Sequence, residues 1–198
     1  MDTEIWAARL DRELTAREQE ALRFFLPPVR RERFLQMKAL SGRREILCAY
    51  GLLRLLLYEK FGWRTLPRIA FLEYGKPWFP DYPRVQFNLS HTAGAVMVGL
   101  SEQPVGVDIE KIRPVSSRMM QRTFGTESQS EFFRRWVLLE AAGKRSGQGL
   151  ASLKMEAKEE DLCRIWNLFP GYVSGVAVSP GCPVQMAHIF TIEGPVPE

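Results

Sequence analysis

A regular alternation in the middle of the chain, Val105–Glu110, constrains the fold more than any other feature of the sequence. Successive side chains of a β-strand point to opposite faces, so the three branched apolar residues of this stretch share one face. Asp108 and Glu110 share the other face, with Gly106 beside them. The alternation therefore predicts a half-buried strand that presents two carboxylates side by side, with room next to them.

Two further strands are predicted directly before this one, at Val85–Ser90 and Ala95–Leu100, and tight polar turns join the three segments. The first of them ends in Ser90 and His91. A hydroxyl and an imidazole at the end of a strand are suited to binding a phosphate.

The pair Asp108 and Glu110 allows two interpretations. Carboxylate oxygens are ligands that Mg²⁺ accepts, and Mg²⁺ usually takes only one or two of them from the protein and completes its octahedron with water and substrate phosphates. The other interpretation is that the two carboxylates form the polar face of an exposed strand. The alternation alone leaves both interpretations open.

A third stretch, Trp136–Leu150, carries Glu140 and Lys144 four residues apart, on one face of a helix predicted over Glu131–Ser146. As a surface pair, these two residues would stabilise the helix by only ~0.2–0.5 kcal/mol. As part of a site, Glu140 would give a cation a third carboxylate, and Lys144 would give a phosphate a positive partner.

Together these stretches resemble a known family. The segments Phe87–His91, Val105–Glu110 and Trp136–Leu150 resemble the three signature motifs of the 4′-phosphopantetheinyl transferases of the surfactin-synthetase-activating (Sfp-like) type. Glu73–Pro77 resembles a fourth segment of that family. The four segments occur in the order of the family and at nearly its spacing, and a weaker similarity extends over most of the chain.

The resemblance implies a fold and an activity. The implied fold is of the α+β class, with two similar α/β halves in a pseudo-dimer and coenzyme A in the cleft between them. The implied reaction transfers 4′-phosphopantetheine from coenzyme A to a serine of an apo acyl or peptidyl carrier protein, depends on Mg²⁺, and releases adenosine 3′,5′-bisphosphate. The sequence does not distinguish a carrier protein of fatty-acid synthesis from one of polyketide or nonribosomal-peptide synthesis.

The resemblance also assigns roles to residues of this chain. The metal ligands it implies are Asp108, Glu110 and Glu140, and the catalytic residues are Glu140, Lys144 and His91. The base that takes the serine proton is either Glu140 or a metal-bound water. The residues implied for coenzyme A are Arg30, Arg33, Lys76, Ser90, His91 and Lys144.

Three of these assignments have alternatives in the sequence. Arg30 and Arg33 lie one turn apart on a predicted helix, so they share a face and can bind the same anion, but a solvated basic helix would carry the same residues. Lys76 lies in a turn predicted at Tyr74–Pro77, where an ordinary surface lysine is the alternative.

The sequence departs from the family in three places. Leu139 stands where the family commonly has a lysine. It is either a lost catalytic contact or, as we expect, a packing or docking residue that lies on a covered apolar face with Leu138. Glu45 stands at the register of a family arginine, directly after Arg43 and Arg44. The segment between the second and third motifs is shorter than is usual. Two other functions therefore stay open: a catalytically weak relative that binds coenzyme A or a carrier protein, and a Mg²⁺-dependent phosphohydrolase.

The stretch Ser101–Pro104 is the best boundary between two halves, which gives residues 1–102 and residues 103–198, the second half carrying the metal site. A faint internal repeat supports this division, because the pattern from Ala95 to Val107 is echoed between Gly175 and Met186. A chance similarity between two β-hairpins is the alternative explanation.

Other elements follow from local patterns. Thr15 and Glu18 form a capping-box signature that opens a helix reaching about Phe25. The segment from Ile46 to Phe61 is apolar nearly all round, which predicts a buried helix. The remaining strands are predicted at Ile5–Leu10, Arg68–Glu73, Ile165–Phe169, Tyr172–Val178 and Val184–Ile192, and a further helix at Ser116–Phe124.

Composition limits the partners and the location. The chain has 198 residues and a net charge of +4, which is too weak to indicate nucleic acid. Three scattered cysteines predict a reducing compartment, and neither a signal pattern nor an apolar run of the ~20 residues that a membrane helix needs is present. We therefore expect a cytoplasmic protein without a membrane partner. Because both halves of the implied cleft lie in one chain, we expect a monomer.

Overall fold

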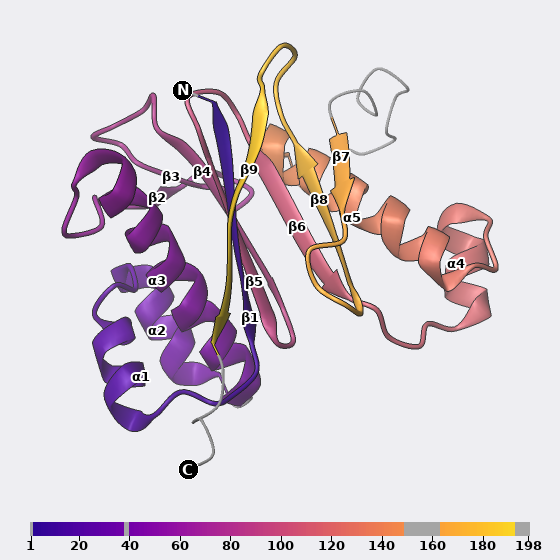
Figure 1. Ribbon diagram of the computed structural model, residues 1–198, viewed down its shortest axis with the longest axis horizontal. Coiled ribbons are helices and arrows are strands. Elements are labelled where there is room, and N and C mark those ends of the chain that lie inside the picture. Colours follow the sequence, from indigo (N-terminus) through magenta and orange to yellow (C-terminus); the bar gives the residue numbers. More distant parts are fainter. Residues whose placement is uncertain (1, 38–39, 149–162, 193–198) are drawn as a thin grey trace.

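The computed structural model describes residues 2–37, 40–148 and 163–192, arranged as two main β-sheets with helices on their outer faces (Figure 1). Helices α1 to α3 lie outside the first sheet, and α5 lies against the second. The first sheet has the strand order β4-β5-β1-β9, and the second has the order β6-β8-β7. The expected mixture of helices and sheets is confirmed, whereas the pseudo-dimeric relation between two halves is not.

In the first sheet, strand β1 lies between β5 and β9. Strand β1 pairs antiparallel with β5 and parallel with β9. The four strands are β1 (Thr3–Leu10), β4 (Gln86–Thr92), β5 (Ala95–Ser101) and β9 (Val184–Ile192). Each strand matches its predicted position to within two residues. Because β9 joins this sheet, the second half of the chain contributes its last strand to the first sheet; the division at residues 102 and 103 stays a prediction.

Helix α3 (Leu40–Phe61) covers the first sheet. Its leucines form the centre of the largest apolar cluster, and Leu47, Leu53, Leu56 and Leu57 are 0% exposed. This confirms the buried helix that its apolar sequence predicts. Two short helices precede it, α1 (Ala16–Arg23) and α2 (Pro28–Gln36).

The capping box of α1 is confirmed. The Thr15 hydroxyl accepts a hydrogen bond from the backbone N–H of Glu18, and the Glu18 carboxylate accepts one from the backbone N–H of Thr15. These reciprocal bonds satisfy two N–H groups that a helix start leaves without partners.

The strand predicted at Arg68–Glu73 is much shorter in the structure. Only β2 (Ala70–Phe71) pairs with β3 (Pro77–Trp78). The chain turns directly after β2, because the N–H of Leu72 donates to the carbonyl of Lys76 and Gly75 adopts a φ of 81°. Glycine tolerates this left-handed conformation, so the turn is local to its sequence.

The second sheet is antiparallel throughout and carries two helices. Its strands are β6 (Gly106–Lys111), β7 (Cys163–Trp166) and β8 (Tyr172–Ala177), and its helices are α4 (Ser117–Phe124) and α5 (Gln129–Ser146). Helix α5 begins two residues earlier than predicted, because the Ser128 hydroxyl accepts a hydrogen bond from the N–H of Glu131 and caps its first turn.

Two glycines let α5 lie unusually close to the second sheet. A Cβ at Gly106 would lie 2.0 Å from the carbonyl oxygen of Ala141, and a Cβ at Gly175 would lie 2.7 Å from that of Val137. The space beside Gly106 is therefore filled by the backbone of α5. This close approach brings α5 to the carboxylate face of β6.

Side chains join the two sheets along a line that we call the seam. Asn88, Ser90 and Thr92 of β4 accept hydrogen bonds from the backbone N–H groups of Val107, Ile109 and Lys111 of β6, at 2.9, 3.3 and 3.4 Å respectively. An apolar cluster behind the seam contains residues from both sheets, among them Ile5, Met97, Val107 and Val176. The faces of β6 are as predicted, with its branched residues in this core.

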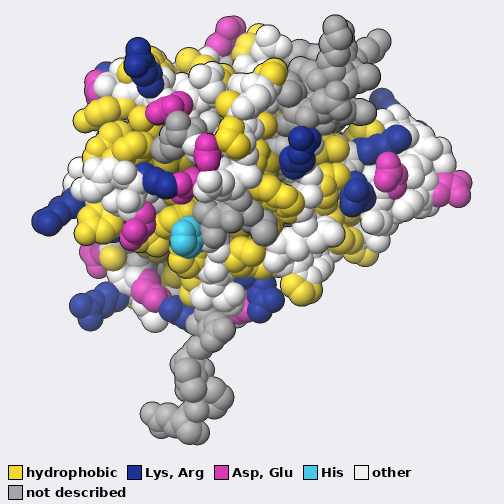
Figure 2. Space-filling model, turned by 45° about the horizontal axis from the view of Figure 1, so that its top comes forward, with side chains coloured by type: hydrophobic (Ala, Val, Ile, Leu, Met, Phe, Trp, Pro, Cys, Tyr) yellow, Lys and Arg dark blue, Asp and Glu magenta, His cyan; other side chains and the backbone are white. Residues whose placement is uncertain are grey.

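Charged side chains are spread over the surface. Figure 2 shows one face of the molecule, on which basic and acidic side chains are interspersed. Within the described residues, no helix is long and apolar enough to cross a membrane.

We predict that Gly106→Ala lowers the free energy of unfolding by about 3 kcal/mol, at the upper end of the usual cost of overpacking, because the colliding atoms belong to the helix backbone and cannot rotate away. Urea denaturation measures this change. Gly42→Ala in α3 is the control, since its new methyl would meet only the flexible end of Met37 and alanine favours a helix. Equal stability of both variants would contradict the prediction.

Candidate functional site

The seam brings together three polar side chains from three distant segments, two of them buried and one partly exposed. Lys144 of α5 places its Nζ 2.6 Å from Asp108 Oδ1 and 3.0 Å from Ser90 Oγ. The Ser90 hydroxyl donates to the same oxygen of Asp108 at 2.8 Å. Asp108 and Ser90 are 3% and 4% exposed. The predicted association of the three motifs is therefore observed at this point, and Lys144 is more than a surface partner of Glu140.

One carboxylate oxygen in this group has no hydrogen-bond partner among the described residues. This oxygen is Oδ2 of Asp108, and it is buried. A buried carboxylate oxygen without a partner is costly and is uncommon in proteins. It marks a position where the site can accept a further donor or a cation.

Glu110 lies two residues along the same face of β6 but has other partners. The Thr92 hydroxyl donates to Glu110 Oε2 at 3.2 Å, and Arg113 lies 2.8 Å from the same oxygen. These contacts hold the carboxylate at the outer end of the seam, and its residue is partly exposed.

Glu140 is half-buried on α5, one turn before Lys144. Burial raises the pKa of Glu140, Lys144 opposes this effect, and the negative charges of Asp108 and Glu110 raise the pKa further. The three carboxylates therefore lie close enough to influence one another. The described residues nevertheless contain no group of three His, Cys, Asp or Glu side chains arranged to hold a metal ion.

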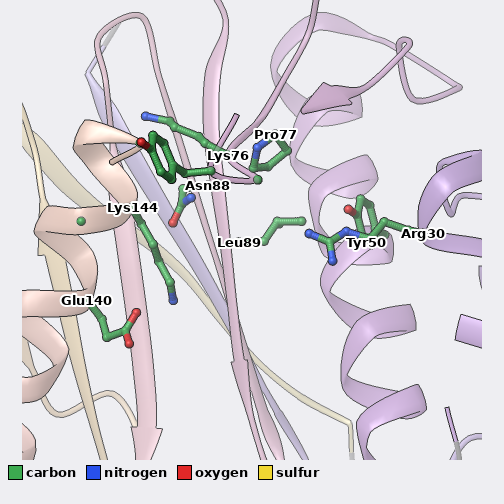
Figure 3. Close-up of a pocket in the computed structure, with 12 residues that line it drawn as sticks. Arg30, Tyr50, Lys76, Pro77, Asn88, Leu89, Glu140 and Lys144 are labelled. Carbon is green, nitrogen blue, oxygen red and sulfur yellow. The ribbon is translucent and has the colours of Figure 1, made fainter. Parts of the chain in front are cut away.

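A pocket of about 260 Å³ opens beside this group (Figure 3). Glu140 and Lys144 of α5 lie on one side, Arg30 and Tyr50 lie on the other, and β4 passes between them. The remaining lining residues are Tyr74, Gly75, Lys76, Pro77, Asn88, Leu89, Gly143 and Gly147. Three cationic side chains from separate segments, Arg30, Lys76 and Lys144, thus converge on one small pocket.

Lys76 reaches from its turn to the end of α5. Its Nζ donates to the backbone carbonyl of Arg145, and its stem lies beside Gly147. Burial lowers the pKa of Lys76 to about 8, and the charge of Arg145 contributes to this shift. Lys76 is therefore not an ordinary surface lysine of a turn.

Arg30 lies across the pocket from Lys144, whereas His91 is not among the described residues that line the pocket. The guanidinium of Arg30 stacks over the ring of Phe71 at 4.9 Å. His91 is exposed as a residue, but partial removal of its ring from water lowers the pKa of its imidazole, and the positive charge of Lys144 lowers it further. The side chain of Arg33 lies outside the described residues, as do Gly149 and Leu150 at the end of the third motif.

The arginines near Glu45 do not line the pocket. Glu45 is 1% exposed, and its Oε1 accepts from Arg44 at 2.7 Å and from the backbone N–H of Gly94 at 3.0 Å. Arg44 also pairs with Glu13, whereas Arg43 lies over the ring of Phe34. Glu45 therefore holds the β4–β5 turn, a structural role that its position in the sequence does not indicate.

The apolar residues before Glu140 differ in their surroundings. Leu138 packs against a buried cluster that includes Ala142 and Cys163, as expected of a covered face. Leu139 is half-buried, and none of the apolar clusters formed by the described residues includes it. The expected covered face is thus confirmed for Leu138 alone.

Asn88 belongs to the first motif and lines the pocket, and the resemblance assigns it no role. It is 4% exposed and belongs to both the seam and the pocket. The signal that could have identified it is the alternation of Asn88, Ser90 and Thr92, three polar side chains on one face of a strand.

Comparisons with known proteins agree with this site. No protein-family model matches the chain. The chain is 29% identical over 160 residues to the 4′-phosphopantetheinyl transferase Sfp of Bacillus subtilis (strain 168), covering 74% of this chain and 71% of that protein. It is 27% identical over 215 aligned positions to the 4′-phosphopantetheinyl transferase psf-1 of Bacillus pumilus, covering 93% and 92%. The resemblance carried by the four motifs is thereby confirmed: the chain is similar to Sfp-like 4′-phosphopantetheinyl transferases over most of its length.

We predict that Lys144→Met lowers the free energy of unfolding by roughly 2–3 kcal/mol, because it leaves the carboxylate of Asp108 buried without a cation. The loss stays below that for a fully buried pair, since the Lys144 side chain is 28% exposed. The double variant Asp108→Asn with Lys144→Met should recover part of the loss, and urea denaturation compares the two. Wild-type stability of Lys144→Met alone would contradict this account.

Proposed function

We propose that this protein transfers 4′-phosphopantetheine from coenzyme A to a serine of an apo acyl or peptidyl carrier protein and releases adenosine 3′,5′-bisphosphate. The observation that carries this proposal is the convergence of Arg30, Lys76 and Lys144 on one pocket beside Glu140. A small pocket with three cations from separate segments suits a compact polyanion. The similarity to enzymes of this name over most of the chain supports the same conclusion.

The chemistry accounts for these residues. The serine oxygen attacks the β-phosphorus of coenzyme A, a new P–O bond forms, and the bond to the α-phosphate oxygen breaks. Negative charge is concentrated on the diphosphate, so catalysis consists mainly of positioning and charge neutralisation. Lys144 and Lys76 supply positive charge to the diphosphate, while Arg30 and His91 hold the rest of the donor.

Glu140 is our candidate for the base that takes the serine proton. It is half-buried and lines the pocket, where it would meet a serine hydroxyl brought to the donor. Its position one turn before Lys144 lets it face the same pocket from the same helix.

Asp108, Glu110 and Glu140 would hold a Mg²⁺ ion. The donor chemistry fits this ion, since all three are carboxylates on facing elements and Asp108 Oδ2 is a buried acceptor without a described partner. Bound there, the ion would neutralise and orient the diphosphate of the donor. Lys144 would turn from Asp108 toward a phosphate, which frees Asp108 for the cation.

We further propose the arrangement in two halves and the monomeric state. The pocket takes residues from α2 and α3 before residue 102 and from α5 after it, so one chain supplies both sides. Sedimentation of active protein tests this, and activity restricted to a dimer or trimer would contradict it. A cytoplasmic location stays a prediction from the composition of the chain.

The experiment that tests the function measures adenosine 3′,5′-bisphosphate formed from coenzyme A and Mg²⁺, with and without an apo carrier protein. The expected result is release only with the carrier and equal incorporation of phosphopantetheine into it. Release without a carrier would indicate a phosphohydrolase. Coenzyme A binding without release would indicate a catalytically weak relative.

We predict that kcat/KM for coenzyme A falls by about tenfold as the pH rises from about 7.5 to 9, because Lys76 loses its charge through a pKa of about 8 and with it a charged hydrogen bond to the donor. Lys76→Arg keeps its charge over this range and should remove most of the fall. Initial rates at saturating carrier protein measure both profiles. Identical profiles would exclude Lys76 as the titrating group.

A further inference from the structure

Asn88 lies at the middle of the pocket wall. It projects from β4 between Lys144 of α5 and the Lys76–Pro77 turn, which Figure 3 shows on either side of it. The residue is 4% exposed, so protein encloses its side chain almost entirely and the pocket reaches only a small part of it.

The seam determines which way this amide faces. Asn88 Oδ1 accepts the backbone N–H of Val107 at 2.9 Å. A backbone N–H can only donate, so the oxygen of the amide must face β6 and the nitrogen must face away from it. Among the described residues, Asn88 Nδ2 donates to no protein acceptor.

An amide nitrogen carries two donors, and the donors of a buried side chain are normally satisfied. Lys76 and Lys144 line the same pocket, and their ammonium groups are donors as well. The acceptor that would suit all three is an anionic oxygen of a ligand, and hydrogen bonds to anionic oxygens are stronger than neutral ones.

We propose that Asn88 is a binding residue for the diphosphate of the donor, whose oxygens accept from Nδ2 between the two lysines. This inference rests on the proposed function. Its particular consequence is that one side chain serves two purposes: its nitrogen binds the diphosphate, and its oxygen holds the strand that carries Asp108. The same side chain would therefore contact both the bound donor and the backbone of β6.

The chain itself suggests a variant that separates these two purposes. Ser90 and Thr92 satisfy the next two N–H groups of β6 with hydroxyls, at 3.3 and 3.4 Å. Asn88→Ser therefore keeps an acceptor for Val107 and removes only the amide nitrogen. Asn88→Asp also keeps the acceptor, but places a carboxylate oxygen where the nitrogen was.

The test is isothermal titration of the wild type and both variants, without added metal, with three probes: coenzyme A, inorganic pyrophosphate and adenosine 3′-monophosphate, which has no diphosphate. We expect Asn88→Ser to weaken the binding of coenzyme A and of pyrophosphate by about tenfold, and Asn88→Asp to weaken the binding of both ligands more. Both variants should bind adenosine 3′-monophosphate within twofold of the wild type and melt within a few degrees of it.

The outcomes separate this inference from the function on which it rests. Unchanged binding of coenzyme A by both variants, or equal weakening of all three probes, would overturn the role of Asn88. A wild type that binds pyrophosphate through Asn88 but does not bind coenzyme A would overturn the proposed function and leave the diphosphate contact standing. If both variants melt far below the wild type, Asn88 serves the fold alone and the inference is wrong.

Discussion

The structure depends on the seam, where side chains of β4 replace a partner strand for β6. The two strands have the same two-residue repeat, so three polar side chains on one face of β4 meet three successive inward N–H groups of β6. Each side chain also serves the site: Asn88 lines the pocket, Ser90 bonds Asp108, and Thr92 bonds Glu110. The same three side chains therefore join the two sheets and position the residues of the site.

The packing of α5 against the second sheet adds Lys144 to the site that the seam forms. Gly106 and Gly175 let the helix backbone approach the second sheet, and this approach delivers Lys144 to a carboxylate that is otherwise buried without a cation. Removing a charged partner from a buried pair is expensive, so Asp108 and Lys144 depend on each other in the free protein. The same pair can part when a diphosphate offers Lys144 another anion.

Part of this site was predictable from residues in sequence. The alternation of Val105–Glu110 and the four-residue spacing of Glu140 and Lys144 correctly indicated which side chains share a face. The contact between Lys144 and Asp108 was not predictable, because it requires the helix to lie within backbone contact of β6. The structural role of Glu45 was likewise hidden, since its partner Gly94 is distant in sequence.

The sequence by itself determined the local elements and the chemical character of the site, because alternation, capping and apolar runs act between near neighbours. Only the tertiary structure decided how those elements meet: that β9 returns to pair with β1, that the turn holding Lys76 reaches the end of α5, and that Asn88 turns its nitrogen into the pocket. These contacts join segments far apart in the chain. Close packing and the need to satisfy buried polar groups determine which segments meet. Both constraints involve residues that are far apart in sequence, so no single stretch of residues reveals them.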